Sequence, residues 1–259
     1  MTQFEDAKEK VKDQFARNAE QYVSSKTHAN GDDLDLLSEW LQLKPHWKVL
    51  DVATGGGHVA KKLAPFAASV TAVDLTRRML ETARNFISQQ SDHVGYVVAD
   101  AENLPFLDES FDAVTCRIAA HHFPNPGQFV NEAARVLKPG GRLLLIDNVV
   151  PDHDSIDDFV NTLERLRDES HVRCSRIREW EEWMKIAGFR ELKSRIRKKA
   201  FDYPTWVRRT ARSEEQVEAV SNHILQGNDE MREYCGLVMK DGAISSIHID
   251  EWMVMLEKV

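Results

Sequence analysis

Short apolar segments alternate with amphipathic segments over residues 48–147, and this alternation restricts the fold more than any other feature. Strands are predicted at 48–52, 69–74, 96–98, 111–116 and 143–147, and helices between them around 59–63, 76–89 and 127–137. Strands that alternate with helices build βαβ units, and such units form a parallel sheet. The sequence therefore predicts an α/β fold with a doubly wound, mostly parallel sheet.

The segments on either side are predicted to be additions to this core. Apolar residues spaced three and four apart predict a helix over 4–24 and a second apolar stripe at 34–41, so residues 1–47 should form an N-terminal helical cap before a ligand-binding core at 48–150. Beyond it, helices are predicted at 155–168, 175–187 and 213–226, with strands near 190–200 and 244–256. These strands bring the sheet to seven, and residues 151–259 should complete it and add a helical lobe over the substrate.

Composition narrows the class of protein. The chain has 259 residues, 42% hydrophobic content and a formal net charge of −8, which argues against a nucleic-acid partner held by overall charge. No stretch approaches the roughly 18 apolar residues of a membrane span, and the polar N-terminus lacks a signal-peptide pattern. The three cysteines are far apart and form no CxxC pair, which fits a reducing cytoplasm. We expect a cytoplasmic protein, for which a homodimer is compatible with the composition.

A glycine-rich loop follows the first predicted strand. The run Val49-Leu50-Asp51-Val52-Ala53-Thr54-Gly55-Gly56-Gly57-His58 has the order strand, loop, helix. In open α/β sheets, ligands bind at the carboxyl ends of the strands, and glycines let the backbone approach them closely. Asp74 ends the second strand, where a carboxylate can accept hydrogen bonds from both ribose hydroxyls. The pattern predicts a site for a ribose-containing cofactor.

Two cofactor classes fit this loop. The run from Gly55 to Ala60 satisfies the G-x-G-x-x-G/A pattern of dinucleotide-binding proteins, so an NAD-binding oxidoreductase is an alternative. Asp51 argues against it, because a carboxylate just before the loop would repel an anionic pyrophosphate. S-adenosylmethionine (SAM) carries an ammonium and a sulfonium instead, which favour an acidic site. The alternative for Asp51 is a cap that only hydrogen-bonds the loop backbone.

Five blocks in order resemble one known family. They are Val-Leu-Asp-Val-Ala-Thr-Gly-Gly-Gly (49–57), Val-Asp-Leu-Thr (73–76) with Met79-Leu80, Ala-Asp-Ala-Glu-Asn-Leu-Pro-Phe (99–106), Ser-Phe-Asp (110–112) and Arg-Val-Leu-Lys-Pro-Gly-Gly (135–141). The segment is similar to the class I SAM-dependent methyltransferases, in particular the methyltransferase type 11 group with its ubiquinone/menaquinone C-methyltransferases. Ala53 stands where the family has its first loop glycine, as in the quinone-methylating branch.

The resemblance implies a place for the methionine end of the cofactor. Gly55 and Gly57 would approach it through their backbones, and Cys116 and Arg117, at the end of the fourth strand, would lie under it.

It also implies a place for the adenosine end. Asp74 would hold the ribose, and Leu75 and Met79 would line the adenine pocket unless they only pack in the core. Asp100 would accept from the adenine amino group and the Ala101 backbone N–H would donate to the ring, although Asp100 could be a simple turn residue.

The acceptor is expected just beyond the fourth strand. Methyl transfer from a sulfonium is an in-line displacement that mainly needs orientation, and a base only if the acceptor must lose a proton. His121 and His122 are the candidate bases, with a structural role in the turn before Pro124 as the alternative. No Asn-Pro-Pro-Tyr motif follows this strand and no metal-ligand spacing is visible, so neither an amino-group DNA methyltransferase nor a metal cofactor is expected.

Substrate contacts are expected from the flanking segments as well. Tyr22 of the first helix, His122, and Arg173 after the fifth strand are the candidates, and Arg173 could meet an anionic group. The alternating Lys193, Arg195, Arg197 and Lys199 share one strand face; a solvated edge is favoured there over a surface for RNA or an anionic acceptor. The chain is thus expected to transfer a methyl group from SAM to a small molecule, with an RNA methyltransferase, an oxidoreductase and a SAM-binding regulator as alternatives.

Overall fold

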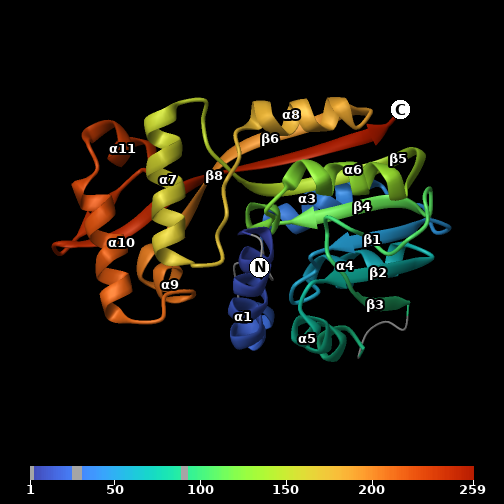
Figure 1. Ribbon diagram of the computed structural model, residues 1–259, viewed down its shortest axis with the longest axis horizontal. Helices are drawn as coiled ribbons and strands as arrows, with labels where there is room; N and C mark the ends of the chain where they lie inside the picture. Colours follow the sequence, from blue (N-terminus) through green and yellow to red (C-terminus); the bar gives the residue numbers. More distant parts are fainter. Residues whose placement is uncertain (1–2, 25–30, 89–92) are drawn as a thin grey trace.

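A single mixed sheet forms the centre of the molecule. The computed structural model describes residues 3–24, 31–88 and 93–259, and the side chains of residues 3 and 18–24 lie outside the description (Figure 1). The strands are β1 (Lys48–Val52), β2 (Ser69–Asp74), β3 (Val94–Val98), β4 (Phe111–Arg117), β5 (Leu137–Val149), β6 (Phe189–Asp202), β7 (Val238–Lys240) and β8 (Ala243–Lys258). Their order is β3-β2-β1-β4-β5-β8-β6, and β7 pairs with β8.

The sheet confirms the predicted architecture. β1 pairs in parallel with β2 and β4, and β2–β3 and β4–β5 are parallel as well. β8 runs antiparallel to both β5 and β6. Seven strands therefore make a mostly parallel sheet as predicted, and the short β7 adds an eighth.

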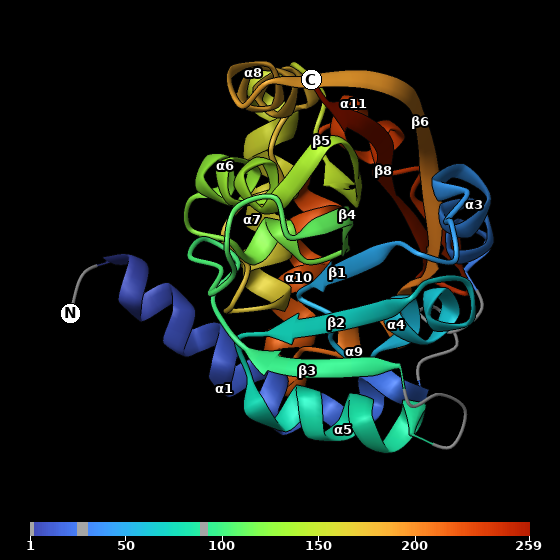
Figure 2. The same cartoon turned by 90° about the vertical axis from the view of Figure 1, so that its right-hand side faces the viewer.

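Helices cover both faces of the sheet, as doubly wound topology requires (Figure 2). One face carries α6 (Pro126–Val136) and α8 (Ile177–Ile186); the other carries α3 (Asp32–Leu41), α4 (His58–Leu63) and α5 (Arg77–Ile87). Alternate residues of one strand serve the two cores: Leu50 packs with Phe129 of α6, whereas Val49 packs with Leu37 of α3. Successive strand residues point to opposite faces, so the uninterrupted apolar strands follow from burial on both sides.

A helical lobe stands at one end of the sheet (Figure 1). It contains α7 (Asp154–Arg167), α9 (Tyr203–Arg208), α10 (Glu214–Gln226) and α11 (Asp229–Tyr234). Leu163, Trp206 and Val220 of this lobe pack with Ile247 of β8 in an apolar cluster of their own. The long strands β6 and β8 therefore run from the core sheet into the lobe.

The helix α1 (Gln3–Ser24) lies between the lobe and the edge of the core near α5 (Figures 1 and 2). Gln14 on this helix is buried and donates to the backbone carbonyl of Thr210, just beyond α9. In the described part of the chain, no helix combines the length and apolar character needed to cross a membrane.

β6 is an edge strand of the sheet, as predicted, but its basic face is only partly solvated. Lys193 lies over the ring of Trp40 of α3, and Arg195 and Arg197 pair with Asp32 at the start of that helix. Arg197 and Lys199 both contact the buried Glu251 of β8. The basic side chains of β6 pack against α3 and β8 because Asp32 of α3 and Glu251 of β8 pair with them.

Candidate active site

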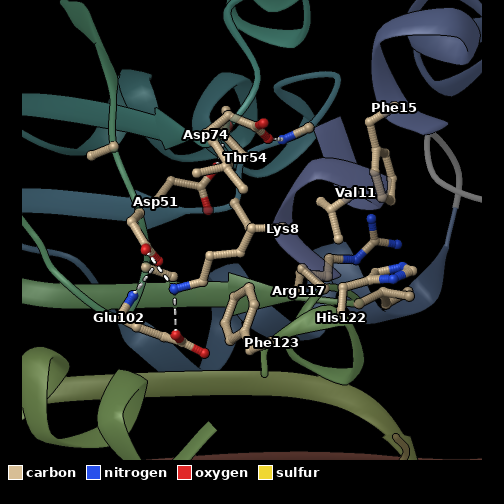
Figure 3. Close-up of a pocket in the computed structure, with 18 of the residues that line it drawn as sticks. Lys8, Val11, Phe15, Asp51, Thr54, Asp74, Glu102, Arg117, His122 and Phe123 are labelled. Atoms are coloured by element: carbon tan, nitrogen blue, oxygen red, sulfur yellow. Dashed lines mark hydrogen bonds and ion pairs between the residues drawn. The ribbon is translucent and has the colours of Figure 1, made fainter. Parts of the chain in front are cut away.

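A cavity opens at the carboxyl ends of β1, β2 and β4, beneath α1 (Figure 3). Its empty space, open mouth included, is about 990 Å³. Seven of the predicted cofactor residues line it: Asp51, Gly55, Asp74, Leu75, Asp100, Ala101 and Arg117. The predicted position at the strand ends is therefore where the chain forms a cavity.

The glycine loop is shaped by left-handed backbone. Gly55 has φ +54° and lines the cavity, where the missing Cβ leaves the backbone accessible. Gly57, at φ +84°, does not line it: a Cβ there would stand 2.8 Å from Ile87 Cδ1 and 3.0 Å from Ala83 Cβ. Gly57 thus lets α4 pack closely on α5. Ala53 adopts φ 53°, where glycine would be relaxed, at a cost of roughly 1 kcal/mol.

Asp51 anchors the loop from within. Its carboxylate accepts hydrogen bonds from the hydroxyls of Thr54 at 2.6 Å and Thr115 at 2.8 Å, and only 1% of the residue is exposed. Burial raises the pKa of Asp51 to about 6, against the opposing effect of these hydrogen bonds. Asp51 therefore accepts from the hydroxyls of Thr54 and Thr115 and from the backbone of Ala60, and it also forms part of the cavity wall.

Asp74 is prepared to accept hydrogen bonds at the end of β2. The backbone N–H groups of Gly55 and Thr76 donate to its two oxygens at 3.0 and 2.8 Å, which fixes the carboxylate. Burial raises the pKa of Asp74 to about 6, so the group is mostly ionised at neutral pH. A fixed, ionised carboxylate at the cavity wall suits a pair of ribose hydroxyls.

The predicted adenine end contains a contact that sequence reasoning missed. Lys8 of α1 reaches between Asp100 and Glu102, with its amino group 2.6 Å from a carboxylate oxygen of each (Figure 3). Within the described residues, the Ala101 backbone N–H has no hydrogen-bond partner and is free to donate to a ligand. Met79 is fully buried behind the wall, with Cε 3.7 Å from the Cβ position at Gly55, so it packs beneath the loop.

The end of β4 supports the other end of the cavity. The Arg117 guanidinium lines it and donates to Asp33 of α3, while Cys116 is fully buried in the core and does not line it. Ile118 follows at φ 53°, an outlier for a β-branched residue, with its N–H held by the Ile146 carbonyl at 2.7 Å. Such strain concentrates at functional sites, and here it redirects the chain from the strand into the histidine turn.

A second, smaller cavity adjoins the first, and we call it the inner chamber. Phe15, Ile118 and His122 line both cavities, and His121 lines the inner one. Asp147, the last acid of the fifth predicted strand, accepts at 2.5 Å from His121 Nδ1 and at 2.9 Å from the His121 backbone N–H. The sequence signal for Asp147 was its position at a strand end.

The pKa values of the two histidines shift in opposite directions. Burial alone would lower the pKa of His121, but the Asp147 carboxylate outweighs burial and raises it above the ordinary value. Burial and the neighbouring His121 lower the pKa of His122 to about 4. His122 Nδ1 lies 2.9 Å from the Ser170 carbonyl. Because a carbonyl only accepts, Nδ1 carries the proton and Nε2 the lone pair of this neutral ring.

The remaining predicted substrate residues lie elsewhere. The side chain of Tyr22 lies outside the described residues. Arg173 pairs with Asp157 and Glu179 at 2.8 Å and lines neither cavity, because these acids hold it against α7 and α8. No group of three or more His, Cys, Asp or Glu placed to hold a metal ion occurs among the described residues.

The charges on the cavity wall distinguish between cofactors. Asp51, Asp74, Asp100 and Glu102 line it with two cations, Lys8 and Arg117. Four acids would repel a pyrophosphate and attract a ligand with an ammonium and a sulfonium. The unpartnered Ala101 N–H and the left-handed Gly55 also leave room for a ligand against the backbone. These features define a nucleotide-cofactor-binding α/β enzyme, and its residues fit SAM.

Comparison with known proteins agrees with this class. A family model for the methyltransferase domain matches residues 50–145. The YcgJ protein of Bacillus subtilis (strain 168), named as an uncharacterized methyltransferase, is 36% identical over 230 residues, which span 88% of this chain and 91% of the relative. A ubiquinone/menaquinone biosynthesis C-methyltransferase of Geotalea daltonii is 34% identical over 116 residues, 43% of this chain and 49% of that protein.

Solved structures give the same result. The crystal structure of a Bacillus halodurans C-125 protein described as a methyltransferase aligns with a TM-score of 0.85 and 43% identity, over 88% of this chain and 99% of that one. The chain therefore belongs to the methyltransferases. It is a SAM-dependent enzyme of the methyltransferase type 11 group, as the five sequence blocks predicted, and the oxidoreductase alternative does not hold.

Proposed function

We propose that this enzyme methylates a small, proton-bearing molecule held in the inner chamber. One observation carries the proposal: the cofactor cavity and the chamber share Phe15, Ile118 and His122, and the chamber adds the His121–Asp147 pair. A methyl donor on one side of this shared wall and an acceptor on the other would be within reach of each other. A general base would then face the acceptor.

The cofactor would be held along the strand ends. Asp74 would accept from the ribose hydroxyls, and Ala101 and Asp100 would bind the adenine edge beside Leu75. Arg117 would meet the methionine carboxylate at the other end, where Figure 3 shows it near His122 and Phe15. When bound, SAM supplies a methyl group on a sulfonium that leaves as a neutral thioether.

Proton removal falls to His121. Asp147 accepts the Nδ1 proton, so the lone pair lies on Nε2, and the carboxylate stabilises the imidazolium that forms. A base whose pKa lies near the working pH combines the correct protonation state with driving force. His122, with its pKa lowered to about 4, stays neutral and is a weaker base. We assign it to the shared wall, where it positions the acceptor against the methyl group.

Enclosure supports a small acceptor over RNA. The chamber lies between α1, the strand ends and the lobe, and His121 and His122 are each 7% exposed. Three of the four basic side chains of β6 that suggested an RNA surface, Arg195, Arg197 and Lys199, are paired with Asp32 or Glu251. Metal-independent chemistry, a cytoplasmic location and a homodimer stay predictions.

Calorimetry with SAM, S-adenosylhomocysteine and NAD tests the cofactor assignment. We expect micromolar binding of the first two and negligible binding of NAD. Asp74→Asn keeps the volume and one acceptor oxygen, and should weaken SAM binding at least about tenfold through lost charge-assisted hydrogen bonds. Incubation of a size-fractionated cell extract with methyl-labelled SAM then tests the acceptor class. Tight NAD binding, or label in RNA in preference to small metabolites, would refute the proposal.

A further inference from the structure

The inner chamber carries more positive charge than a site for a neutral acceptor needs. Arg167 from the end of α7, Lys199 of β6 and Arg209 after α9 reach it from three separate elements. Asp168 is the carboxylate on its lining. The acids that neutralise the bases, such as Glu164 beside Arg167 at 2.7 Å, stand behind the wall. The lobe side of the chamber therefore presents cations to whatever enters.

Two polar groups on strands that line the chamber, Lys199 of β6 and Asn148 of β5, keep unused hydrogen-bonding capacity. Lys199 is 11% exposed and gives one proton to Glu251 at 2.5 Å; within the described chain its ammonium has no second hydrogen-bond partner. Glu251 is shared with Arg197, and the other carboxylate near Lys199 is the buried Asp33, which pairs with Arg117. Asn148 is 8% exposed and lines the chamber, and its side-chain amide has no partner among the residues described. Both groups line the chamber, so their unused hydrogen-bonding capacity is open to a ligand there.

Aromatic rings form the rest of the lobe side. Phe201 and Trp206 lie with ring centroids 6.0 Å apart, and the Arg167 guanidinium stacks over Trp206 at 4.2 Å. Across the chamber, Phe15 packs edge-on to His122 at 5.0 Å. Walls of this kind accept a flat apolar body between a charged end and a reactive end.

We propose that the inner chamber binds a small acceptor with a flat apolar body and a carboxylate or phosphate group, whose charged end faces Lys199 and Asn148 and whose nucleophile faces His121. This inference deepens the proposed function and rests on it for the reaction, but not for binding. The basic side chains on the lobe side orient the carboxylate or phosphate of the ligand. The ionised Asp168 beside His122 repels a second anionic group from the end of the chamber at His121.

Binding of defined probes to the protein saturated with S-adenosylhomocysteine tests the proposal. The probes are 4-hydroxybenzoate, phenyl phosphate and the neutral 4-hydroxybenzyl alcohol, followed by calorimetry. We expect at least one anionic probe to bind about tenfold or more tightly than the alcohol, the scale of one or two hydrogen bonds to a charged group. Preference for the carboxylate or for the phosphate identifies the acidic group. Equal binding of anionic and neutral probes, or no anion binding at millimolar concentrations, would overturn the inference.

Variants separate the chamber from the cofactor cavity. Lys199→Met should reduce anion affinity about tenfold while Glu251 keeps Arg197, and Asn148→Asp should do the same by adding a negative charge. The matched control is Lys193→Met on the same face of β6, where the lysine covers Trp40 outside the chamber. Binding of the alcohol and of S-adenosylhomocysteine should not change. Anion binding that is indifferent to Lys199→Met and Asn148→Asp would contradict the site. Failure of S-adenosylhomocysteine to bind would instead contradict the proposed function. The anion preference would then be measured on the free protein, where it still tests the inference.

Discussion

His121 and His122 are neighbours in the chain but occupy opposite electrostatic environments. Both are buried, which disfavours the charged form, yet only His121 has a carboxylate at hydrogen-bonding distance. The ring centroids lie 4.3 Å apart, so charge on one ring opposes charge on the other. The pair therefore keeps one ring able to take a proton and one ring neutral.

The pH dependence of methyl transfer follows from this division. The pKa of His121 lies above 6.5 in the folded protein, so its basic form, and with it the rate, should rise with pH through that value. Asp147→Asn removes the charge that raises the pKa, so the rising limb should move to lower pH, and the plateau rate should fall about 100-fold. Steady-state rates from pH 5 to pH 9 with labelled SAM measure both effects.

The control for this variant is the cofactor affinity, which should stay unchanged because Asp147 does not line the cofactor cavity. A rising limb that stays at the same pH would assign proton removal to another group.

The stability of the fold depends on pH in the opposite direction to the rate. Because the pKa of His121 is raised on folding, the His121–Asp147 pair stabilises the fold below about pH 6.5, and this contribution disappears as pH rises through the folded-state pKa.

At the scale of elements, α1 closes the cofactor cavity, and Lys8 ties the helix to the opposite wall. Lys8 lies on the same side of the helix as Val11 and Phe15, which also line the cavity. Its ammonium bridges Asp100 and Glu102, so a ligand that uses Asp100 must share it with Lys8. We therefore expect Lys8 to slow the entry of the cofactor.

Lys8→Met should remove the ionic bridge from α1 to Asp100 and Glu102. We expect SAM to associate about five- to tenfold faster, since two half-buried charge-assisted contacts no longer hold α1 over the adenine end. Stopped-flow protein fluorescence would measure the association rate constant. Lys12→Met, which breaks an exposed pair with Glu9 on the same helix, is the matched control and should leave the rate unchanged. Equal association rates for wild type and Lys8→Met would show that this bridge does not slow entry of the cofactor.

Long elements were predictable because their patterns repeat. The helix predicted over 4–24 spans Gln3–Ser24, and the helix predicted over 213–226 spans Glu214–Gln226. The six-residue helices α9 and α11 were missed, since fewer than two turns show little periodicity. The equally short α4 was predicted because it follows the glycine-rich loop. The cofactor residues were predicted from motifs at the strand ends, and most of them line the cavity; Gly57, Met79 and Cys116 do not. Asp147 had its position at a strand end as a signal, but the contacts that Lys8 and Asp147 make join distant segments, and no local pattern predicts such contacts.

At the scale of the whole molecule, the two cavities lie where the core of the sheet meets the core of the lobe. The sheet provides the cofactor cavity, and the lobe provides Arg167, Arg209 and the aromatic wall of the inner chamber. β8 connects them: Ile247 lies in the lobe cluster and Trp252 in the core cluster. Because the same strand is buried in both, the lobe has little freedom to unfold alone.

We therefore expect a single cooperative unfolding transition for the entire chain. Leu163→Ala, at a fully buried position of the lobe, should destabilise the protein by about 2–5 kcal/mol, and should lower Tm by several degrees without splitting the transition. Leu225→Ala, at a position 42% exposed on α10 of the same lobe, is the control and should change Tm little. In scanning calorimetry the calorimetric and van't Hoff enthalpies should agree for each protein. S-adenosylhomocysteine, bound to the sheet, should raise the transition as a whole, because a ligand of the native state stabilises every segment that unfolds with it. Two resolved transitions, with Leu163→Ala moving one and the ligand moving the other, would show that lobe and core fold independently.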